Sequence, residues 1–377
     1  MVQEFKSVGI IGAGASGCVC AYFLFKSGMK SVTLFDYSTP LRTILPTGGG
    51  RCNFAHAEYD SKELASNYPR GEKFLYSVFS KFSTSDTLSL FEEFGIESYT
   101  QEDGRIFPVS NDSKDVRNKI LAKIKGADFV KEKVLQIMPI DGGFKLKSDK
   151  AEYFFTDIVI STGGGSVIKG TNHSIVPYKP SLVGLNTDVK NLSGIVLKNV
   201  YSKDINESGD ILFTHFGISG PLVYKISSIK AREKFPYDLS FDLYPKEFDF
   251  QVLLNENPHK CVKNILSEIF PIRFAEMISG DTAEIQGCKV DGKTRDKILN
   301  KINNFTVTVN GTNKGEETVT AGGYDLNEIN SKTMESKLCP HLFFTGEVVD
   351  IDGFCGGFNL QNAWSTAYVA AQGIING

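Results

Sequence analysis

The chain has 377 residues, 41% of them hydrophobic, a size that predicts two or three domains with a sizeable core. Its formal net charge of −3 and its scattered Lys and Arg exclude the clustered positive field that nucleic acids and anionic membranes attract. The apolar runs are far shorter than the ~20 residues that cross a bilayer, and no secretory signal pattern opens the sequence. We therefore expect a cytoplasmic protein with no nucleic-acid or membrane partner.

Cysteine usage points to the same compartment. The odd number of cysteines and the lack of a C-x-x-C pair argue against a disulfide framework and a zinc site, so we predict no metal. The seven are Cys18, Cys20, Cys52, Cys261, Cys288, Cys339 and Cys355.

A glycine motif typical of dinucleotide binding lies near the start of the chain. The apolar run Ser7–Ile11 predicts a buried strand, and Cys18–Ser27 predicts a helix. The loop between them, Gly12-Ala-Gly14-Ala-Ser-Gly17, has the spacing G-x-G-x-x-G. Its glycines allow a tight turn, the approach of a pyrophosphate, and close packing of helix and strand. The helix N-terminus then offers free N–H groups to the phosphates.

The next segment completes a dinucleotide-binding unit. Ser31–Phe35 predicts a second strand, which ends in Asp36, an acid placed to accept hydrogen bonds from ribose hydroxyls. Because strand, motif, helix, strand and acid occur in order, we predict a dinucleotide site rather than a structural glycine turn.

The middle of the chain favours FAD over NAD. Leu41–Asn53 is rich in glycine and proline, so we expect it to lie extended along the cofactor. Helices are predicted over Glu72–Phe82, Asp86–Phe94 and Ser113–Lys125, followed by a parallel strand at Ala127–Val130. Three short strands come next, at Val134–Ile140, Phe144–Ser148 and Tyr153–Thr156. Such a three-stranded meander is typical of FAD-binding folds of the glutathione-reductase type.

Two later segments predict further cofactor contacts. A strand from Asp157 leads into a glycine loop at Thr162–Gly165, and a strand at Leu342–Thr345 leads into Gly346, Glu347 and Asp350. An acid after this last strand typically holds a ribityl hydroxyl. A helix is then expected over Leu360–Ile375, with Asn359 as its N-cap and its N-terminus aimed at the flavin.

The region between these halves is predicted to be an insert. Strand patterns at Val189–Ser202, Ile211–Phe213 and Tyr237–Tyr244 suggest a β subdomain, and Phe248–Asn303 suggests a helical one, with Asn257-Pro258 starting a helix. The predicted division is residues 1–185 for the first part of the FAD-binding domain, 186–246 for the β subdomain, 247–317 for the helical subdomain, and 318–377 for the second part.

Several longer motifs resemble those of a known family. They are Gly9–Gly17, Thr47–Asn53, Gly104–Ser110, Thr214–Pro221, Val319–Gly323, Gly346–Gly353 and Gly356–Gln361. With these motifs the chain resembles the bacterial flavoproteins that include the aminoacetone oxidases and a reductase linked to bile-acid dehydroxylation. The resemblance implies FAD, an α/β fold with a split Rossmann domain, and an insert with β and helical parts. The chain departs from the family at Asp36, where Glu is usual, and at Phe358, where Tyr is usual.

The FAD contacts predicted from these motifs extend over the whole chain. They are Gly12, Gly14, Ala15, Ser16, Gly17, Asp36, Tyr37, Arg42, Thr47, Gly48, Gly49, Gly50, Arg51, Cys52, Asn53, Val134, Thr162, Gly163, Gly164, Gly346, Glu347, Asp350, Gly357, Phe358, Asn359, Leu360 and Ala363.

Few side chains are candidates for chemistry, because the flavin itself carries the redox step. Arg51 either stabilises reduced flavin or substrate, or holds a phosphate or its own loop. His215 is either an acid/base or a structural histidine. Arg105 is expected to tie a loop, and Cys52 and Cys355 to fill space rather than react.

The sequence therefore predicts an FAD-dependent oxidoreductase acting on a small molecule. The substrate is either an amine, with O2 as the electron acceptor, or an enone, with NAD(P)H as the donor. With one G-x-G-x-x-G and no C-x-x-x-x-C, the chain lacks the second Rossmann unit and redox disulfide of a pyridine-nucleotide disulfide reductase. The alternatives are a non-catalytic or RNA-associated flavoprotein and a flavin redox sensor.

Overall fold

The computed structural model describes residues 6–189, 191–243, 249–313, 315 and 319–377. These residues form two units: one from the described residues up to Lys179 and from Val319 to Gly377, the other from those between Pro180 and Thr318. In this part of the chain, no helix combines the length and apolar character that crossing a membrane requires.

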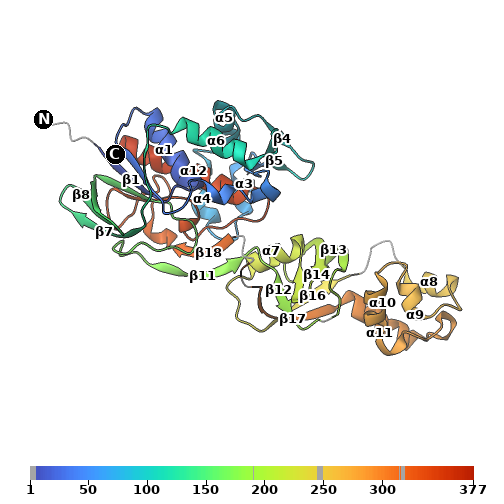
Figure 1. The fold of residues 1–377 in the computed structure, drawn as a ribbon. Coiled ribbons are helices and arrows are strands. Elements are labelled where there is room, and N and C mark those ends of the chain that lie inside the picture. Colours follow the sequence, from blue (N-terminus) through green and yellow to red (C-terminus); the bar gives the residue numbers. More distant parts are fainter. Residues whose placement is uncertain (1–5, 190, 244–248, 314, 316–318) are drawn as a thin grey trace. The chain divides into compact units, whose positions relative to one another are not determined.

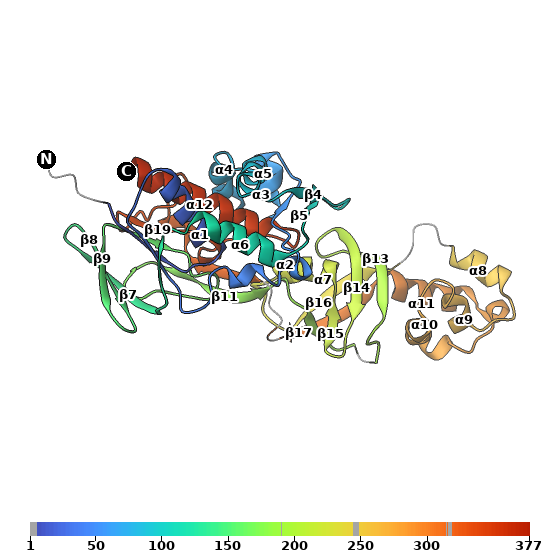
Figure 2. The same cartoon turned by 45° about the horizontal axis from the view of Figure 1, so that its top comes forward.

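The first unit is built on a parallel sheet (Figures 1 and 2). Its strand order is β19-β10-β1-β2-β6, and every neighbouring pair is parallel. The strands are β1 (Val8–Ile11), β2 (Val32–Phe35), β6 (Asp128–Val130), β10 (Asp157–Ile160) and β19 (Leu342–Phe344). A separate antiparallel meander contains β7 (Val134–Ile140), β8 (Gly143–Ser148) and β9 (Glu152–Phe155). This architecture confirms the predicted Rossmann fold with an added three-stranded meander.

The first unit also contains helices. They are α1 (Ala15–Lys26), α2 (Thr47–Gly50), α3 (Ser61–Ser66), α4 (Glu72–Phe79), α5 (Thr84–Glu93), α6 (Ser113–Lys123) and α12 (Phe358–Asn376). The first helix, α1, packs along α12 and also contacts α6 (Figure 2). The small side chains of Ala367, Ala370 and Ala371 are fully buried, which allows this close approach of α12.

Two smaller sheets complete the first unit. One is antiparallel and contains β3 (Ala55–His56), β4 (Ser98–Thr100) and β5 (Arg105–Pro108). The other pairs β11 (Ile175–Ser181) with β18 (Val319–Tyr324). The short strand β3 is joined to α12, because the indole N–H of Trp364 donates to the Phe54 carbonyl at 2.9 Å.

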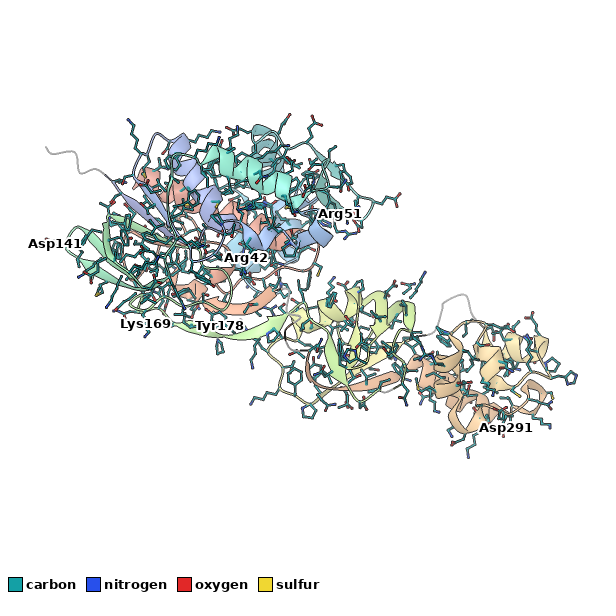
Figure 3. All side chains as sticks on the ribbon, viewed as in Figure 1. Arg42, Arg51, Asp141, Lys169, Tyr178 and Asp291 are labelled. Atoms are coloured by element: carbon teal, nitrogen blue, oxygen red, sulfur yellow. The ribbon has the colours of Figure 1, made fainter. Side chains whose placement is uncertain are left out.

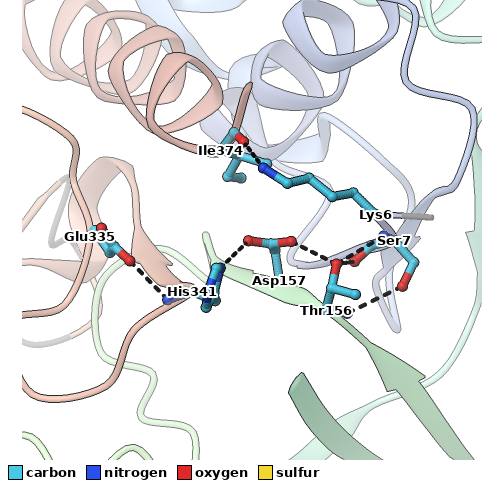
Figure 4. A network of polar contacts seen from close by, with 7 residues as sticks. All are labelled: Lys6, Ser7, Thr156, Asp157, Glu335, His341 and Ile374. Carbon is cyan, nitrogen blue, oxygen red and sulfur yellow. Dashed lines mark hydrogen bonds and ion pairs between the residues drawn. The ribbon is translucent and has the colours of Figure 1, made fainter. Parts of the chain in front are cut away.

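A network of polar contacts lies at the amino-terminal end of β10, which is an inner strand of the sheet (Figure 4). Asp157 is only 1% exposed, and its two carboxylate oxygens meet His341 Nδ1 at 3.0 Å and the Thr156 hydroxyl at 2.6 Å. Nearby, Lys6 Nζ donates to the Ile374 carbonyl at 2.9 Å. This cation lies at the C-terminal end of α12, where a positive charge is favoured.

The second unit consists of a closed barrel, one helix beside it, and a group of helices (Figure 1). The barrel order is β12-β15-β14-β13-β16-β17. Its strands are β12 (Leu185–Thr187), β13 (Val196–Ser202), β14 (Glu207–Phe213), β15 (Gly217–Ser219), β16 (Tyr237–Asp242) and β17 (Phe305–Thr312). The helices are α7 (Pro221–Ile229), α8 (Phe250–Glu256), α9 (Val262–Leu266), α10 (Ile272–Ser279) and α11 (Gly292–Asn303).

The insert differs from the sequence prediction in two respects. The range 247–317 is not entirely helical, because β17 returns to the barrel and pairs with both β16 and β12. Asn257 is not an N-cap: it ends α8, and its side chain donates to the Leu253 carbonyl at 3.1 Å. The predicted bounds at Tyr244, Lys246, Glu247, Phe248, Glu317 and Thr318 lie outside the described residues, as does Lys190 within a predicted strand.

The segment Leu41–Asn53 is also not extended, contrary to expectation. It forms a 3-10 turn at Arg42–Ile44 and then the tight turn α2. Gly48, Gly49 and Gly50 have φ values of 58°, 70° and 86°, so the chain curls through three left-handed residues in a row. Figure 3 labels Arg42 and Arg51, which lie near the two ends of this segment.

Candidate active site

Three loops meet at the carboxyl ends of β1, β10 and β19. Because these strands are parallel neighbours, their carboxyl ends share one edge of the sheet. A Cβ added to Gly12 would stand 2.3 Å from the Ser161 carbonyl oxygen, and one added to Gly346 would stand 2.7 Å from Ser16 Oγ. The loops after β10 and β19 therefore both contact the segment that follows β1.

The three motif glycines have different surroundings. A Cβ on Gly17 would stand 2.0 Å from the Gly12 carbonyl oxygen, so this position packs helix against strand. A Cβ on Gly14 would meet nothing closer than Thr43 Oγ1 at 4.0 Å, so open space lies beside the start of α1. Gly14 is also the N-cap, without a side chain to occupy the first N–H groups of α1. This open cradle at a free helix N-terminus fits the pyrophosphate of FAD.

Asp36 lies at the end of β2, beside this cradle. Its Oδ2 accepts the Ala13 N–H at 2.9 Å, and its Oδ1 accepts the N–H and hydroxyl of Ser38 at 2.7 and 2.8 Å. A carboxylate accepts about four hydrogen bonds, so capacity remains for a ribose hydroxyl. The ribose contact itself stays a prediction, but the position fits it.

Side chains at the end of α2 bond to the turn itself and to the neighbouring strands β3 and β5. Arg51 Nε donates to the Gly48 carbonyl at 3.1 Å, and its guanidinium lies 4.1 Å from the centre of the Phe107 ring. Asn53 Nδ2 donates to the carbonyls of Ala55 and Ile106 at 2.9 Å each. In the described chain, no acceptor meets the two terminal nitrogens of Arg51, so they remain for a ligand. The Asn53 amide nitrogen, in contrast, is committed to the protein.

Cys52 is a poor candidate for chemistry. Its side chain is fully buried, and burial raises the pKa of its thiol to about 12. Cys355 is exposed at the surface, but partial burial of its thiol raises its pKa, which the Arg105 charge partly counteracts. A raised pKa does not favour a reactive thiolate at either position.

Glu347 lies where the loops after β10 and β19 meet β18. Its Oε1 accepts the Thr320 N–H at 2.7 Å, and a Cβ on Gly164 would stand 2.8 Å from the same oxygen. The pKa of this carboxyl is raised to about 7, mainly by burial; the negative charge of Asp352 also raises it, and the N–H groups of Thr320 and Gly164 lower it. The carboxyl can therefore carry or release a proton near neutral pH.

This carboxyl makes stability depend on pH. The folded protein holds the Glu347 proton to about pH 7, whereas the ordinary value is 4.5, so stability falls as pH rises from 4.5 through about 7. We expect Glu347→Gln to remove this fall. Between about pH 5 and pH 8, the wild-type FAD-free protein should lose on the order of 1–3 kcal/mol relative to the variant in urea unfolding.

A matched control is Glu328→Gln. Glu328 accepts the Ser174 N–H at 2.8 Å, but at the surface. This variant should follow the wild-type pH dependence. Parallel curves for wild type and Glu347→Gln would contradict a carboxyl that takes up its proton near pH 7.

The start of α12 lies in the same unit. The helix begins at Phe358 with Gly357 as its N-cap, which corrects the prediction that Asn359 is the cap. Asn359 instead clamps the preceding loop, because its side chain accepts the Gly353 N–H and donates to the Gly353 carbonyl, both at 2.8 Å. Among the described residues, no side chain caps the first turn by a hydrogen bond, so its N–H groups are available to a ligand, and their contact with FAD stays a prediction.

Two contacts to this loop were missed by the sequence prediction. Arg70 forms a two-pronged ion pair with Asp352, and their side chains are 9% and 0% exposed. Tyr68, also buried, donates its hydroxyl to the Phe358 carbonyl at 2.6 Å. Both contacts join residues more than 280 positions apart, so no local pattern signals them.

The other predicted site residues take varied positions. Ser16, Val134, Gly346 and Ala363 are buried in the first unit, whereas Tyr37 and Arg42 are exposed there. His215 belongs to the second unit, where it is exposed between β14 and β15. Its catalytic role, and the individual FAD contacts, stay predictions. In the described ranges, no three His, Cys, Asp or Glu side chains gather as a metal site requires.

Comparisons with known proteins agree with this geometry. The HI0933-like protein Rossmann domain matches residues 6–373. A ribosomal RNA dihydrouridine synthase of Haemophilus influenzae is 32% identical over 410 residues, covering 99% of each chain. A 3-dehydro-bile acid delta(4,6)-reductase of Clostridium scindens is 26% identical over 412 residues, covering 97% of this chain and 98% of the relative.

A solved structure supports the fold. The open conformation of a flavocytochrome c3 fumarate reductase superposes with a TM-score of 0.51 at 14% identity, covering 99% of this chain and 78% of the other. The family match, the open cradle at Gly14 and the placement of Asp36 identify the cofactor as FAD and confirm the resemblance found in the sequence. The chain is an FAD-dependent oxidoreductase and belongs to the HI0933-like protein family.

Proposed function

We propose that this chain reduces a carbon–carbon double bond conjugated with a carbonyl group. The observation that carries this proposal is that two full-length relatives with different names share this chemistry. Dihydrouridine is uridine with its C5=C6 bond reduced, and that bond is conjugated with the C4 carbonyl. A delta(4,6)-reductase of a 3-dehydro bile acid reduces ring double bonds conjugated with the 3-oxo group.

The site has the parts that this reaction needs. When bound, FAD takes two electrons from a reductant and passes a hydride to the substrate. The protein must then bind the carbonyl oxygen and supply a proton. Arg51 offers its two terminal nitrogens, and Glu347, whose pKa is raised to about 7 by burial, holds a proton near neutral pH. Such groups favour a substrate that gains negative charge on oxygen.

NAD(P)H is the reductant we propose. The chain has a single G-x-G-x-x-G, at Gly12–Gly17, so NAD(P)H has no second Rossmann unit to occupy. We therefore expect it to bind transiently at the flavin, reduce it and leave before the acceptor enters.

Anaerobic half-reactions test this proposal. The purified FAD-loaded protein is mixed with NADPH or NADH, and bleaching of the flavin absorbance is followed in a stopped-flow instrument. The reduced protein is then mixed with a 3-oxo-4,6-diene steroid or with unmodified ribosomal RNA. We expect bleaching by one nicotinamide and at least tenfold faster recovery of the flavin absorbance with one of the two acceptors than with buffer.

The two acceptors distinguish the substrate class. Recovery with RNA, together with dihydrouridine found by mass spectrometry, would assign uridine in RNA, which the 32% identical relative favours. Recovery with the steroid alone would assign a small-molecule enone, which the net charge of −3 favours. A flavin bleached only by amines, with peroxide formed in air, would contradict the reductase and indicate an oxidase.

A further inference from the structure

The short strand β3 lies against the start of α12. Trp364 of α12 donates to the Phe54 carbonyl at 2.9 Å, and a Cβ on Gly357 would stand 2.3 Å from the Ala55 carbonyl oxygen. The next residue, His56, stacks on Phe358 with ring centres 4.6 Å apart and an interplanar angle of 26°. His56 therefore borders the loop from which the helix starts.

One ring nitrogen of His56 is bound to that loop. Its Nδ1 lies 3.0 Å from the Gly356 carbonyl oxygen. Because a carbonyl oxygen only accepts, Nδ1 carries the hydrogen of this bond. The other nitrogen, Nε2, faces Gly104, where an added Cβ would stand 2.5 Å away.

Within the described part of the chain, the N–H donors of the first turn of α12 meet no acceptor. The earliest bond within the helix runs from the Gln361 N–H to the Gly357 carbonyl at 2.9 Å. The N–H groups of Phe358, Asn359 and Leu360 precede it, and no acidic residue lies in this turn. A 19-residue helix with a bare N-terminus favours negative charge in front of it, and the FAD ring gains negative charge on reduction.

We propose that His56 is a positioning residue for FAD. Its Nδ1–H holds the Gly356 carbonyl, which fixes the Gly356–Gly357 turn and thereby aims the first N–H groups of α12 at the flavin ring. The aligned helix then binds reduced FAD more tightly than oxidised FAD. The role belongs to the hydrogen bond and not to a charge on the imidazole.

The titratable residues near His56 are consistent with a role for its hydrogen bond rather than for a charge on its ring. On the β5 side, Arg105 is paired with Asp103, with Nε and Oδ2 2.7 Å apart. In the loop, the only titratable side chain next to Gly356 is Cys355, whose pKa is raised by burial. Besides the stacking on Phe358, the bond from Nδ1 to Gly356 is therefore the polar contact through which His56 acts on the helix.

The midpoint potential of the bound FAD tests this proposal. It is measured by equilibration with a reference dye, without substrate or NAD(P)H, so the result does not depend on the proposed reaction. We expect His56→Leu to bind reduced FAD about tenfold less tightly relative to oxidised FAD, which lowers the two-electron potential by about 30 mV.

Two amide variants separate the ring nitrogens. The amide nitrogen of Asn takes about the place of Nδ1, and that of Gln about the place of Nε2. We therefore expect His56→Asn to keep the wild-type potential and His56→Gln to match His56→Leu. The comparison of Asn with Gln remains informative if the Leu variant folds poorly.

A matched control comes from His173. Its Nδ1 also meets a backbone carbonyl, that of Thr171 at 2.6 Å, and its ring contacts Phe344 at 4.9 Å. His173→Leu should leave the potential unchanged. An unchanged potential in His56→Leu would overturn the proposal. So would rescue by Gln without rescue by Asn, because His56 would then act through Nε2.

Discussion

Replacing Gly14 by valine is expected to abolish FAD retention while the FAD-free protein still folds. The Cβ would enter open space, since the nearest atom is Thr43 Oγ1 at 4.0 Å. The backbone at Gly14, with φ −80° and ψ −163°, suits a β-branched residue. The new side chain therefore blocks the pyrophosphate but not the fold. We expect the dissociation constant for FAD to rise by about 100-fold or more.

Titration of FAD into the flavin-free protein measures this effect. The single tryptophan, Trp364, is fully buried in α12 and reports both folding and flavin binding by its fluorescence. Gly292→Val is the matched control, because a Cβ there also meets open space, in the second unit. Gly17→Ala provides the contrast, since its Cβ would clash with the Gly12 carbonyl at 2.0 Å and destabilise the protein itself. Full FAD affinity in Gly14→Val would refute the pyrophosphate cradle.

Breaking the ion pair between Arg70 and Asp352 is expected to cost more stability than any surface change. Asp352 is fully buried, and Arg70 is nearly so. Replacing Arg70 by methionine leaves a buried carboxylate without its main partner, which costs about 3–5 kcal/mol. The free energy of unfolding in urea should fall by this amount, and FAD retention should weaken because the pair anchors the loop before α12.

The double variant tests whether the charge is responsible. Arg70→Met with Asp352→Leu removes both charges and should recover most of the loss. Lys26→Met serves as a control, because Lys26 pairs with Glu93 at the surface, where the two side chains are 53% and 42% exposed, and its loss should cost less than about 1 kcal/mol. A double variant as unstable as Arg70→Met would mean that shape, not charge, matters at this position.

The Rossmann half of the fold could be predicted because its signals are local. Gly12, Gly14 and Gly17 fix the turn, the apolar runs of β1 and β2 flank it, and Gly28 lies just beyond the end of α1 with a φ of 93°. Each signal needs only a few neighbouring residues, so a single sequence carries it. The meander over β7–β9 was predicted in the same way, from three short strands in succession, and Figure 3 labels Asp141 in the turn between the first two.

The errors arose where several conformations suit the same residues. A run of glycines permits an extended chain or a left-handed curl, and only contacts such as that of Arg51 with Phe107 select the curl. Asn359 is a good N-cap residue, yet its two bonds to Gly353 use the same side chain differently. In Phe305–Thr312, buried and more exposed residues alternate as in a strand. The predicted helical subdomain, 247–317, nevertheless included this segment.

The missed site residues depend on contacts between distant parts of the chain. His56 gains its role from Gly356, 300 positions later, and Arg70 gains its role from Asp352. In the sequence, each is an ordinary polar residue near a loop. Only the folded chain, which brings β3 and the segment before α4 against the start of α12, gives them a function.

The contact between Lys6 and Ile374 has a consequence for engineering. Lys6 Nζ donates a hydrogen bond to the Ile374 carbonyl oxygen at 2.9 Å. The segment before β1 therefore contacts the C-terminal end of α12. A linker between the segment at Lys6 and the end of α12 would join segments that already meet, and new ends can be opened in an exposed turn such as that at Asp141-Gly142. In such a permutant, β19 and α12 lead directly into β1 and its nucleotide loop, two parts of the FAD-binding unit that the second unit otherwise separates.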